Sequence, residues 1–339
     1  MIKYLLPREG QFYKANLHCH STISDGRLTP EELKEAYKAH GYSVLSVTDH
    51  ELMAPHHDLT DPDFLLMTGF EMSFDEENPG DRDGKTCHIC FVALNENEVY
   101  QPCFHRTKYL DENRRKLATF DPAEPDFERA YTPESINEAM RIGREKGFFV
   151  TYNHPVWSLE RYAEYSRYEG MHAMEICNYS SVVSGWDEYN PRVYEDFLHQ
   201  NKRIWVIGAD DNHNWQQPDH PKWDSFGAYA MIRAPRLTYR DIADALAAGH
   251  FYASQGPEIR GLWLEDDVLH VDCSPAVRVY CITKARRCMA GYGENGALAE
   301  HAEFQIRPSD GYVRVSVQDE KGNRADSNAY FTDELFSGR

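Results

Sequence analysis

Short apolar runs alternate with helix-like segments over residues 1–257, and this alternation limits the fold more than any other feature. The runs are rich in β-branched and aromatic residues, as strands are, and cover residues 44–47, 65–70, 88–94, 148–152, 173–177, 204–208 and 228–232. Between them, Thr29-Pro30, Thr132-Pro133 and Thr238 with Asp241 are typical of helix N-termini. Strands that alternate with helices predict parallel β/α units, and seven or eight such units predict an α/β fold with a closed or distorted barrel.

The pattern changes near residue 258. Short alternating runs follow at 262–264, 268–271, 277–283 and 313–317, and the segments between them are rich in the turn residues Asp, Gly, Ser and Asn. We therefore expect two domains, an α/β barrel over residues 1–257 and a small β-sandwich-like domain over residues 258–339.

Residues 95–131 interrupt the alternation with a long segment that is both basic and aromatic. Long insertions in compact domains are often lids or substrate loops, and a solvated surface helix is the alternative. If this insertion contacts an anionic substrate, the candidate cations are Arg106, Lys108, Arg114 and Arg115.

The formal net charge is −19 at pH 7, which argues against binding of a nucleic-acid duplex because that requires a basic surface. An acidic protein also repels anionic substrates, so a phosphate-binding site would need local positive charge. The sequence contains neither a run of eighteen apolar residues nor a signal-peptide pattern at its start, so we expect a cytoplasmic protein without a membrane span. The oligomeric state stays open.

The eight cysteines include one C-x-x-C pair, Cys87 and Cys90. Such a pair is typical of zinc or redox sites, but it lies inside an apolar run and no second pair follows. We therefore interpret both residues as buried strand thiols.

Histidines and carboxylates gather where the predicted strands give way to loops. His18 and His20 lie two residues apart, so their rings point the same way on an extended segment. The other groups are Asp25, Asp49 with His50, Glu71, His88, His154, and Asp210 with Asp211 and His213. Active sites of β/α barrels are built at strand ends, whereas solvated polar residues are scattered over helix faces. The pattern predicts a metal site.

These motifs resemble the polymerase and histidinol phosphatase (PHP) superfamily of metal-dependent phosphoesterases. The matching segments are Asn16-Leu17-His18-Cys19-His20-Ser21-Thr22, Ser24-Asp25-Gly26, Val47-Thr48-Asp49-His50, Gly69-Phe70-Glu71, Asn153-His154-Pro155 and Asp211-Asn212-His213. The resemblance covers roughly residues 10–257. It implies a distorted (β/α)7 barrel with two to three divalent metal ions at the C-terminal ends of the strands.

The resemblance also assigns metal ligands. One ion would be held by His18, His20, Glu71 and Asp211, a second by Asp25, His50 and His213, and a third by Glu71 as a bridge with His88 and His154. Glu71, Asp211 and His213 would be central to catalysis. Imidazole and carboxylate without thiolate suits Mn²⁺, Fe²⁺ or Zn²⁺. Three such ions against three carboxylates leave a formal charge of about +3, which would attract an anionic substrate.

Two further carboxylates lie beside these ligands. We expect Asp49 to orient a metal-binding imidazole from behind. Asp210 precedes Asp211, and neighbours on an extended segment point to opposite sides. Asp211 has the same parity as His213, so Asp211 is the expected ligand and Asp210 would support the cluster indirectly.

The expected function is hydrolysis of a small-molecule phosphate ester, of the nucleotide or sugar phosphate class. Paired metals lower the pKa of bound water and supply hydroxide for attack on phosphorus near neutral pH. One alternative is an amidohydrolase-type metal-dependent hydrolase, which also begins with H-x-H but often bridges its metals through a modified lysine, where this chain has Glu71. The other is a degenerate metal-binding module, which should have lost ligands, whereas all nine positions are filled here.

Overall fold

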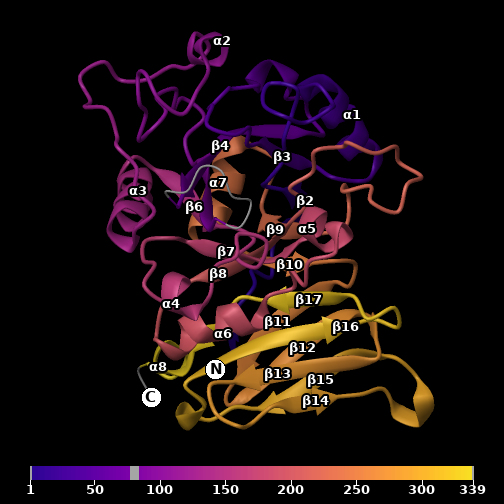
Figure 1. Cartoon of the computed structure of the whole chain (residues 1–339). Helices are drawn as coiled ribbons and strands as arrows, with labels where there is room; N and C mark the ends of the chain where they lie inside the picture. The colour runs from indigo at the N-terminus through magenta and orange to yellow at the C-terminus, as the bar shows by residue number, and fades with distance from the viewer. Residues whose placement is uncertain (1, 77–83, 338–339) are drawn as a thin grey trace.

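The structure, a computed structural model, describes residues 2–76 and 84–337. A mixed α/β unit packs on a unit of antiparallel strands (Figure 1). The strands of the α/β unit are β2 (Gln11–Asn16), β3 (Val44–Val47), β4 (Leu65–Asp75), β5 (Thr86–Ala93), β6 (Phe148–Tyr152), β7 (Ala173–Asn178), β8 (Trp205–Ala209), β9 (Tyr229–Ala234) and β10 (Phe251–Ser254). Its helices are α1 (Pro30–Ala39), α2 (Glu112–Arg115), α3 (Pro133–Glu145), α4 (Tyr162–Tyr165), α5 (Tyr179–Ser184), α6 (Pro191–His199) and α7 (Tyr239–Ala247), with a 3₁₀ turn, η1 (His57–Leu59).

The strands of this unit form one mixed sheet. Its order is β10-β9-β2-β3-β4-β5-β6-β7-β8. Neighbouring strands are parallel within β2-β3-β4 and within β6-β7-β8, whereas β5 is antiparallel to both β4 and β6. Strands β3 and β6 are buried along their whole length, which explains why they were legible as continuous apolar runs.

The predicted (β/α)7 barrel is not confirmed, because the sheet of the described residues does not close by a strand ladder. A single parallel bridge, between Cys19 and Asn212, links the segments that follow β2 and β8. The expectation of parallel units throughout is wrong at β5, and it is also wrong at β9, which is antiparallel to β2. Only ten residues separate the end of β4 at Asp75 from the start of β5 at Thr86, too few for a helical crossover, so the two strands pair as an antiparallel hairpin.

Helices α1, α3 and α7 each begin directly after a threonine that caps the helix N-terminus. Thr29 caps α1 in a reciprocal box with Glu32, Thr132 caps α3, and Thr238 accepts a hydrogen bond from the backbone of Asp241 at the start of α7. Each of these helices buries one apolar face against the sheet, with Leu33 and Ile136 fully buried. None of the described helices is long and apolar enough to cross a membrane.

The antiparallel unit contains two sheets around a common core. Strands β1 (Ile2–Tyr4), β11 (Ile259–Glu265), β12 (Val268–Ala276) and β15 (Ala299–Gln305) form one sheet, in the order β1-β11-β12-β15. The other elements are β13 (Arg278–Thr283), β14 (Met289–Gly291), η2 (Glu294–Gly296), η3 (Pro308–Asp310), β16 (Tyr312–Gln318), β17 (Arg324–Ser327), β18 (Tyr330–Phe331) and α8 (Thr332–Leu335). Residues from both sheets, such as Val271 and Val315, share one hydrophobic cluster, the arrangement expected of a β-sandwich.

The two units are continuous in the hydrogen-bonded sheet. Strand β17 pairs with β10, so strands β13, β14, β16 and β17 extend the large sheet of the α/β unit. From the other end of the chain, β1 pairs with β11. The domain boundary between residues 257 and 258 therefore stays a prediction.

The insertion at residues 95–131 has little regular structure, and α2 projects from the molecule (Figure 1). It shares a small core with the segment after β3, in which Leu52, Phe104 and Leu110 are buried and the ring of Phe120 stacks on that of Phe104. The insertion is thus folded against the α/β unit rather than being a simple solvated helix.

A carboxylate is buried among tyrosines outside the predicted metal site. Glu160 accepts hydrogen bonds from the hydroxyls of Tyr131 (2.8 Å), Tyr152 (2.6 Å) and Tyr168. Burial raises the pKa of Glu160 from 4.5 to about 7, even though the three hydroxyl donors lower it. The folded protein therefore binds this proton more tightly than the unfolded chain does.

Stability should consequently fall as the pH rises from about 4.5 to about 7, since the folded state binds more protons over this window. Replacement of the titrating group by Glu160→Gln should flatten that part of the profile. The free energy of unfolding in urea, measured at several pH values, tests this. The exposed Glu169→Gln serves as the control and should keep the wild-type slope. Equal slopes in wild type and Glu160→Gln would contradict the assignment.

Candidate metal centre

The nine predicted metal ligands lie together at one edge of the α/β sheet. They are His18 and His20 after β2, Asp25 in the following turn, His50 after β3, Glu71 on β4, His88 on β5, His154 after β6, and Asp211 and His213 after β8. His88 comes near the start of its strand, unlike the others. Because β5 is antiparallel to β4, its first residues lie at the same edge as the ends of its neighbours.

Glu71 is at the centre of the cluster and is fully buried. Its Oε1 atom lies 3.1, 2.9 and 3.3 Å from ring nitrogens of His18, His88 and His154. Its Oε2 atom lies 2.9 and 3.4 Å from ring nitrogens of His50 and His20. Burial by itself raises the pKa of Glu71, but the imidazoles of His18, His88 and His50 lower it well below its usual range. One carboxylate thus reaches two sets of imidazoles, as a bridging ligand must.

Asp211 lies on the other side of the first two histidines. Its Oδ1 atom is 3.1 Å from His18 Nε2 and 2.9 Å from His20 Nε2, and Asn178 donates a hydrogen bond to its Oδ2 atom at 3.1 Å. Asp211 has a left-handed backbone, with φ of 53°. Asp211 therefore faces the cluster, as predicted. The backbone at Asp211 is not extended, however, so the alternation of side chains assumed in the prediction does not apply.

Asp25 belongs to a second, more exposed group. Its Oδ2 atom lies 3.4 Å from His213 Nε2 and 3.7 Å from His50 Nε2, and its Oδ1 atom lies 3.8 Å from His20 Nδ1. Its side chain is 46% exposed, whereas Glu71 and His20 are fully buried. The cluster therefore opens to solvent on the side of Asp25.

Three overlapping groups could each hold a metal ion in this region. They are His18, His20, Glu71 and Asp211; His20, Asp25, His50 and His213; and His50, Glu71 and His88. The first two match the expected sets, with His20 added to the second. The third contains His50 where His154 was expected, and His154 lies beside it, 3.3 Å from Glu71.

The residues fit a group of divalent metals. His20 Nδ1 and Glu71 Oε2 are buried without a well-formed hydrogen bond, although ring nitrogens of His50 and His20 lie 2.9 and 3.4 Å from Glu71 Oε2. Unsatisfied buried polar atoms are costly unless another partner binds them. Burial, together with the neighbouring rings of His213 and His50, lowers the pKa of His20 to about 4, so this ring is in its neutral, metal-binding form at pH 7.

Glu175 is a functional residue that the sequence reasoning missed. It is fully buried on β7, and its Oε1 atom lies 2.7 Å from His18 Nδ1, so the opposite ring nitrogen of His18 faces the cluster. Its Oε2 atom accepts hydrogen bonds from the backbone of His154 (3.1 Å) and from Asn178 (2.9 Å). A carboxylate behind a metal-binding imidazole fixes its orientation. The available signal was a lone carboxylate inside the apolar strand Ala173–Asn178.

Asp49 does not make the contact that was predicted. Instead of an imidazole, its carboxylate accepts hydrogen bonds from the backbone and hydroxyl groups of Ser21 (2.8 and 2.6 Å) and Ser24 (3.1 and 2.5 Å). These bonds close the turn that leads to Asp25. Asp49 therefore acts on the loop of a predicted ligand rather than on a ring.

Asp210 is buried and points away from the cluster. Its carboxylate accepts hydrogen bonds from the backbone amides of Phe226 (2.8 Å), Gly227 (2.9 Å) and Ala228 (3.0 Å) and from the hydroxyl of Tyr37 (2.8 Å). Burial raises the pKa of Asp210 to about 6 against the effect of these donors. The residue ties the loop before β9 to α1.

The four candidate cations of the insertion are differently placed. Arg106 is bound by Asp126, Lys108 by Glu128, and Arg115 by backbone carbonyls of its own insertion. Arg114 pairs with Asp111 and also donates to the carbonyl of His50 at 3.3 Å. Of these four, Arg114 is the one that contacts a predicted ligand residue, so the predicted substrate role is best placed on Arg114.

Cys87 and Cys90 are both buried and unpaired on β5, which confirms their interpretation as strand thiols. Burial raises the pKa of the Cys90 thiol to about 11, so it is not a thiolate at neutral pH. With its side-chain amide oriented to satisfy all of its neighbours, Asn153 accepts a hydrogen bond from the backbone amide of Cys90 at 3.3 Å.

The similarities between this chain and known proteins are limited in extent. No protein-family model matches it. A curated 5′-3′ exoribonuclease of Haemophilus influenzae is 39% identical over 91 residues, which span 26% of this chain and 30% of the exoribonuclease.

Three solved structures are similar at low sequence identity. A two-domain protein from Bacteroides vulgatus that contains a predicted PHP-like metal-dependent phosphoesterase is 16% identical, with a TM-score of 0.47 over 97% of both chains. A protein from Bifidobacterium adolescentis described as a metal-dependent phosphoesterase is 15% identical, with a TM-score of 0.39 over 63% of this chain and 91% of its own. An amidohydrolase from Chromobacterium violaceum is 15% identical, with a TM-score of 0.38 over 70% of this chain and 96% of its own.

The neighbouring carboxylates Asp211 and Asp210 should respond differently to the same substitution. Asp211→Asn removes a negative charge between His18 and His20. We therefore expect loss of at least one metal ion and a drop in the rate of hydrolysis of roughly 10²-fold or more. Asp210→Asn places an amide group against backbone amides, so we expect a loss of about 1–3 kcal/mol in the free energy of unfolding with metal content unchanged. Elemental analysis and thermal unfolding of both variants test this. A metal-poor Asp210→Asn beside a metal-replete Asp211→Asn would reverse the assignment.

Proposed function

We propose that this chain is a metal-dependent phosphoesterase of the PHP type that hydrolyses the phosphate ester of a small molecule. The observation that supports this most is the convergence of five imidazoles on the buried carboxylate of Glu71, with Asp211 and Asp25 beside them. Such a set holds two or three divalent ions of the Mn²⁺, Fe²⁺ or Zn²⁺ class. The motif resemblance of the sequence points to the same family.

The side chains have distinct roles in this proposal. Bound divalent metals supply Lewis acidity and a lowered pKa for water. Glu71 would bridge the ions, Asp211 and His213 would be ligands from the β8 side, and Glu175 positions the His18 ring. Arg114, which lies against His50, is the candidate for contact with a phosphate oxygen.

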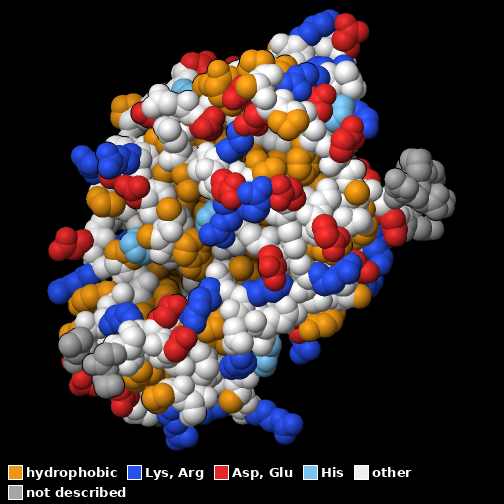
Figure 2. Space-filling model, turned by 90° about the vertical axis from the view of Figure 1, so that its left-hand side faces the viewer, with side chains coloured by type: hydrophobic (Ala, Val, Ile, Leu, Met, Phe, Trp, Pro, Cys, Tyr) orange, Lys and Arg blue, Asp and Glu red, His pale blue; other side chains and the backbone are white. Residues whose placement is uncertain are grey.

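Local charge reconciles an anionic substrate with a net charge of −19. The ligand set contains three carboxylates, so two or three divalent ions would leave the site with a formal charge of about +1 or +3. On the face that Figure 2 shows, acidic and basic side chains are intermixed rather than gathered into a basic area. A metal-loaded centre would supply local positive charge for substrate attraction, which favours a small ligand over a long polyanion.

A cavity of about 520 Å³ lies between α1 and the loop that follows β8. Arg27 and Asn214, which follow the predicted ligands Asp25 and His213 closely in sequence, contribute to its wall. Other lining residues include His40, Gln217, Trp223 and Phe226. Aromatic surface with a few hydrogen-bonding groups is typical of small-molecule sites. We assign this cavity to the leaving group of the ester.

The amidohydrolase alternative is less well supported by the geometry. In that class a modified lysine often occupies the bridging position, whereas here Glu71 contacts both sets of imidazoles. The degenerate module is disfavoured as well, since all nine ligand side chains converge.

Removal of metal should abolish the activity. Protein dialysed against a chelator should lose hydrolysis of phosphate esters and regain it with Mn²⁺, Fe²⁺ or Zn²⁺, because the ligands need a cation to bind substrate and activate water. A panel of nucleotides, sugar phosphates, a short oligoribonucleotide, amides and lactones would identify the substrate class. Turnover of amides or lactones alone would refute the phosphoesterase proposal, and unchanged activity after demonstrated metal loss would refute the metal dependence.

The cavity assignment predicts a selective effect on substrate binding. Trp223→Ala removes an aromatic wall, so we expect KM to rise about tenfold, equivalent to about 1.4 kcal/mol, with kcat changed much less. Kinetics on the best substrate of the panel measure both constants. Tyr292→Ala, which removes an exposed aromatic ring from the antiparallel unit, is the control. An unchanged KM in Trp223→Ala would place the leaving group elsewhere.

A further inference from the structure

Two histidines and two carboxylates face each other on the outer side of the antiparallel unit, far along the chain from the centre described above. His270 and Asp272 lie two residues apart on β12, and His301 and Glu303 lie two apart on β15. The strand register pairs His270 with Glu303 and Asp272 with His301. All four side chains therefore share one face, while Leu269 and Val271 point into the core.

Their ligand atoms converge on one point. His270 Nδ1 lies 3.4 Å and His301 Nε2 lies 3.3 Å from the same oxygen of Glu303, Oε1. Two imidazole nitrogens and one carboxylate oxygen within 4.8 Å of one another form a possible ligand triad. A simple cross-strand ion pair would need only one of the two rings.

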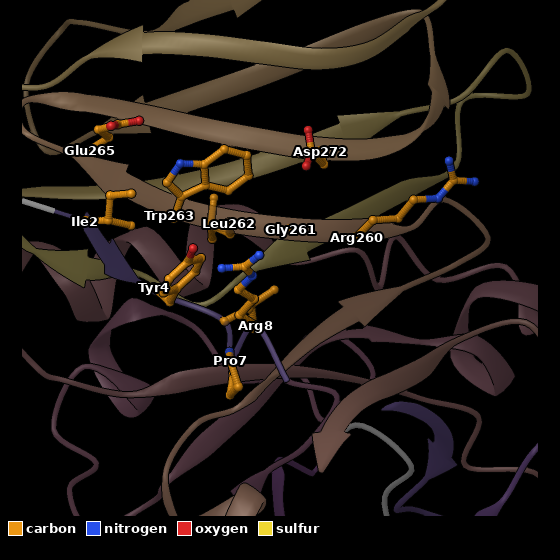
Figure 3. Close-up of a pocket in the computed structure, with 11 residues that line it drawn as sticks. Ile2, Tyr4, Pro7, Arg8, Arg260, Gly261, Leu262, Trp263, Glu265 and Asp272 are labelled. Atoms are coloured by element: carbon orange, nitrogen blue, oxygen red, sulfur yellow. The ribbon is translucent and has the colours of Figure 1, made fainter. Parts of the chain in front are cut away.

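A neighbouring side chain contacts each ring and restricts its orientation. The second nitrogen of His301, Nδ1, lies 2.6 Å from Asp272 Oδ1; when Nδ1 donates its proton to this carboxylate, Nε2 can bind an ion on the side of Glu303. A carboxylate in this position is the usual partner of a metal-binding histidine. The ring of His270 stacks on Trp263 of β11, with centroids 4.9 Å apart and planes at 2°. Figure 3 shows Trp263 and Asp272 on neighbouring strands of this sheet.

We propose that His270, His301 and Glu303 form a second divalent-metal site, with Asp272 as the residue that positions His301. Two imidazoles and one carboxylate suit Zn²⁺, and three protein ligands leave its remaining positions to water. The side chain of His270 is 14% exposed and that of Glu303 is 59% exposed, so an ion can reach the site directly from solvent. A bound ion would join β12 to β15 by a link between side chains. The site is independent of the phosphoesterase proposal.

Zinc stoichiometry of the full chain tests this proposal. Wild type and His270→Ala/His301→Ala are equilibrated with Zn²⁺ and analysed for bound metal per chain. We expect the double variant to bind one Zn²⁺ fewer, with the hydrolytic activity of the metal-loaded protein unchanged. The matched control is His199→Ala/His220→Ala, which removes two exposed histidines elsewhere and should bind as much zinc as wild type.

Two single variants guard against misfolding and define the roles. Glu303→Gln changes an exposed ligand and should also lose this zinc. Asp272→Asn should weaken it by about 10- to 100-fold, since a supporting carboxylate is removed. Co²⁺ absorption gives a second readout, because bands from this site should vanish in the double variant while those of the main centre remain. The same zinc stoichiometry and affinity in wild type, the double variant and Glu303→Gln would overturn the proposal.

Discussion

The burial of one carboxylate governs the architecture of the α/β unit. Glu71 has no exposed surface, and an isolated carboxylate in such a place would be strongly unfavourable. It is accommodated because imidazoles from the segments that follow β2, β3 and β6, and from β5, all reach its two oxygens. The loops at this edge are therefore held at fixed positions relative to β4. Outer carboxylates, above all Glu175, extend the same network into the sheet.

The reversed direction of β5 is part of this arrangement. A parallel strand at this position would present its C-terminal end to the cluster, whereas the antiparallel hairpin presents its start. His88 thereby lies opposite Ser73, two residues beyond Glu71 on the neighbouring strand. The hairpin thus supplies one more imidazole to the cluster.

Local patterns made much of this structure predictable. Buried parallel strands such as Val44–Val47 and Phe148–Tyr152 were recognisable because both of their faces are apolar. The starts of helices were recognisable because Thr and Pro occupy the capping positions. The metal-site residues were recognisable from motifs. Strand direction was not, because β5 has the same apolar composition whichever way it runs, and only the short connection from β4 distinguishes the two.

Side-chain partners were harder to predict than ligands. Asp49 and Glu175 are both buried carboxylates near the cluster, but the sequence places Asp49 beside a ligand and Glu175 far from any. Their actual partners, Ser21 and His18, depend on which strands are neighbours in space. The role of Asp210 likewise depends on backbone amides of a loop sixteen to eighteen residues away in sequence.

The pairing of β1 with β11 and of β17 with β10 has a consequence for how the chain reaches this structure. During synthesis β1 emerges long before its partner, so it must wait unpaired while the α/β unit is made. Pairing β1 with β11 closes a loop that contains the whole α/β unit, and closure of so long a loop is slow for entropic reasons. The edge of β10 likewise stays unpaired until β17 has been made. The partly made chain would therefore be prone to pairing with other strands at two places. Strand β1 can be covered once β11 has been translated, and β10 only once β17 has been translated.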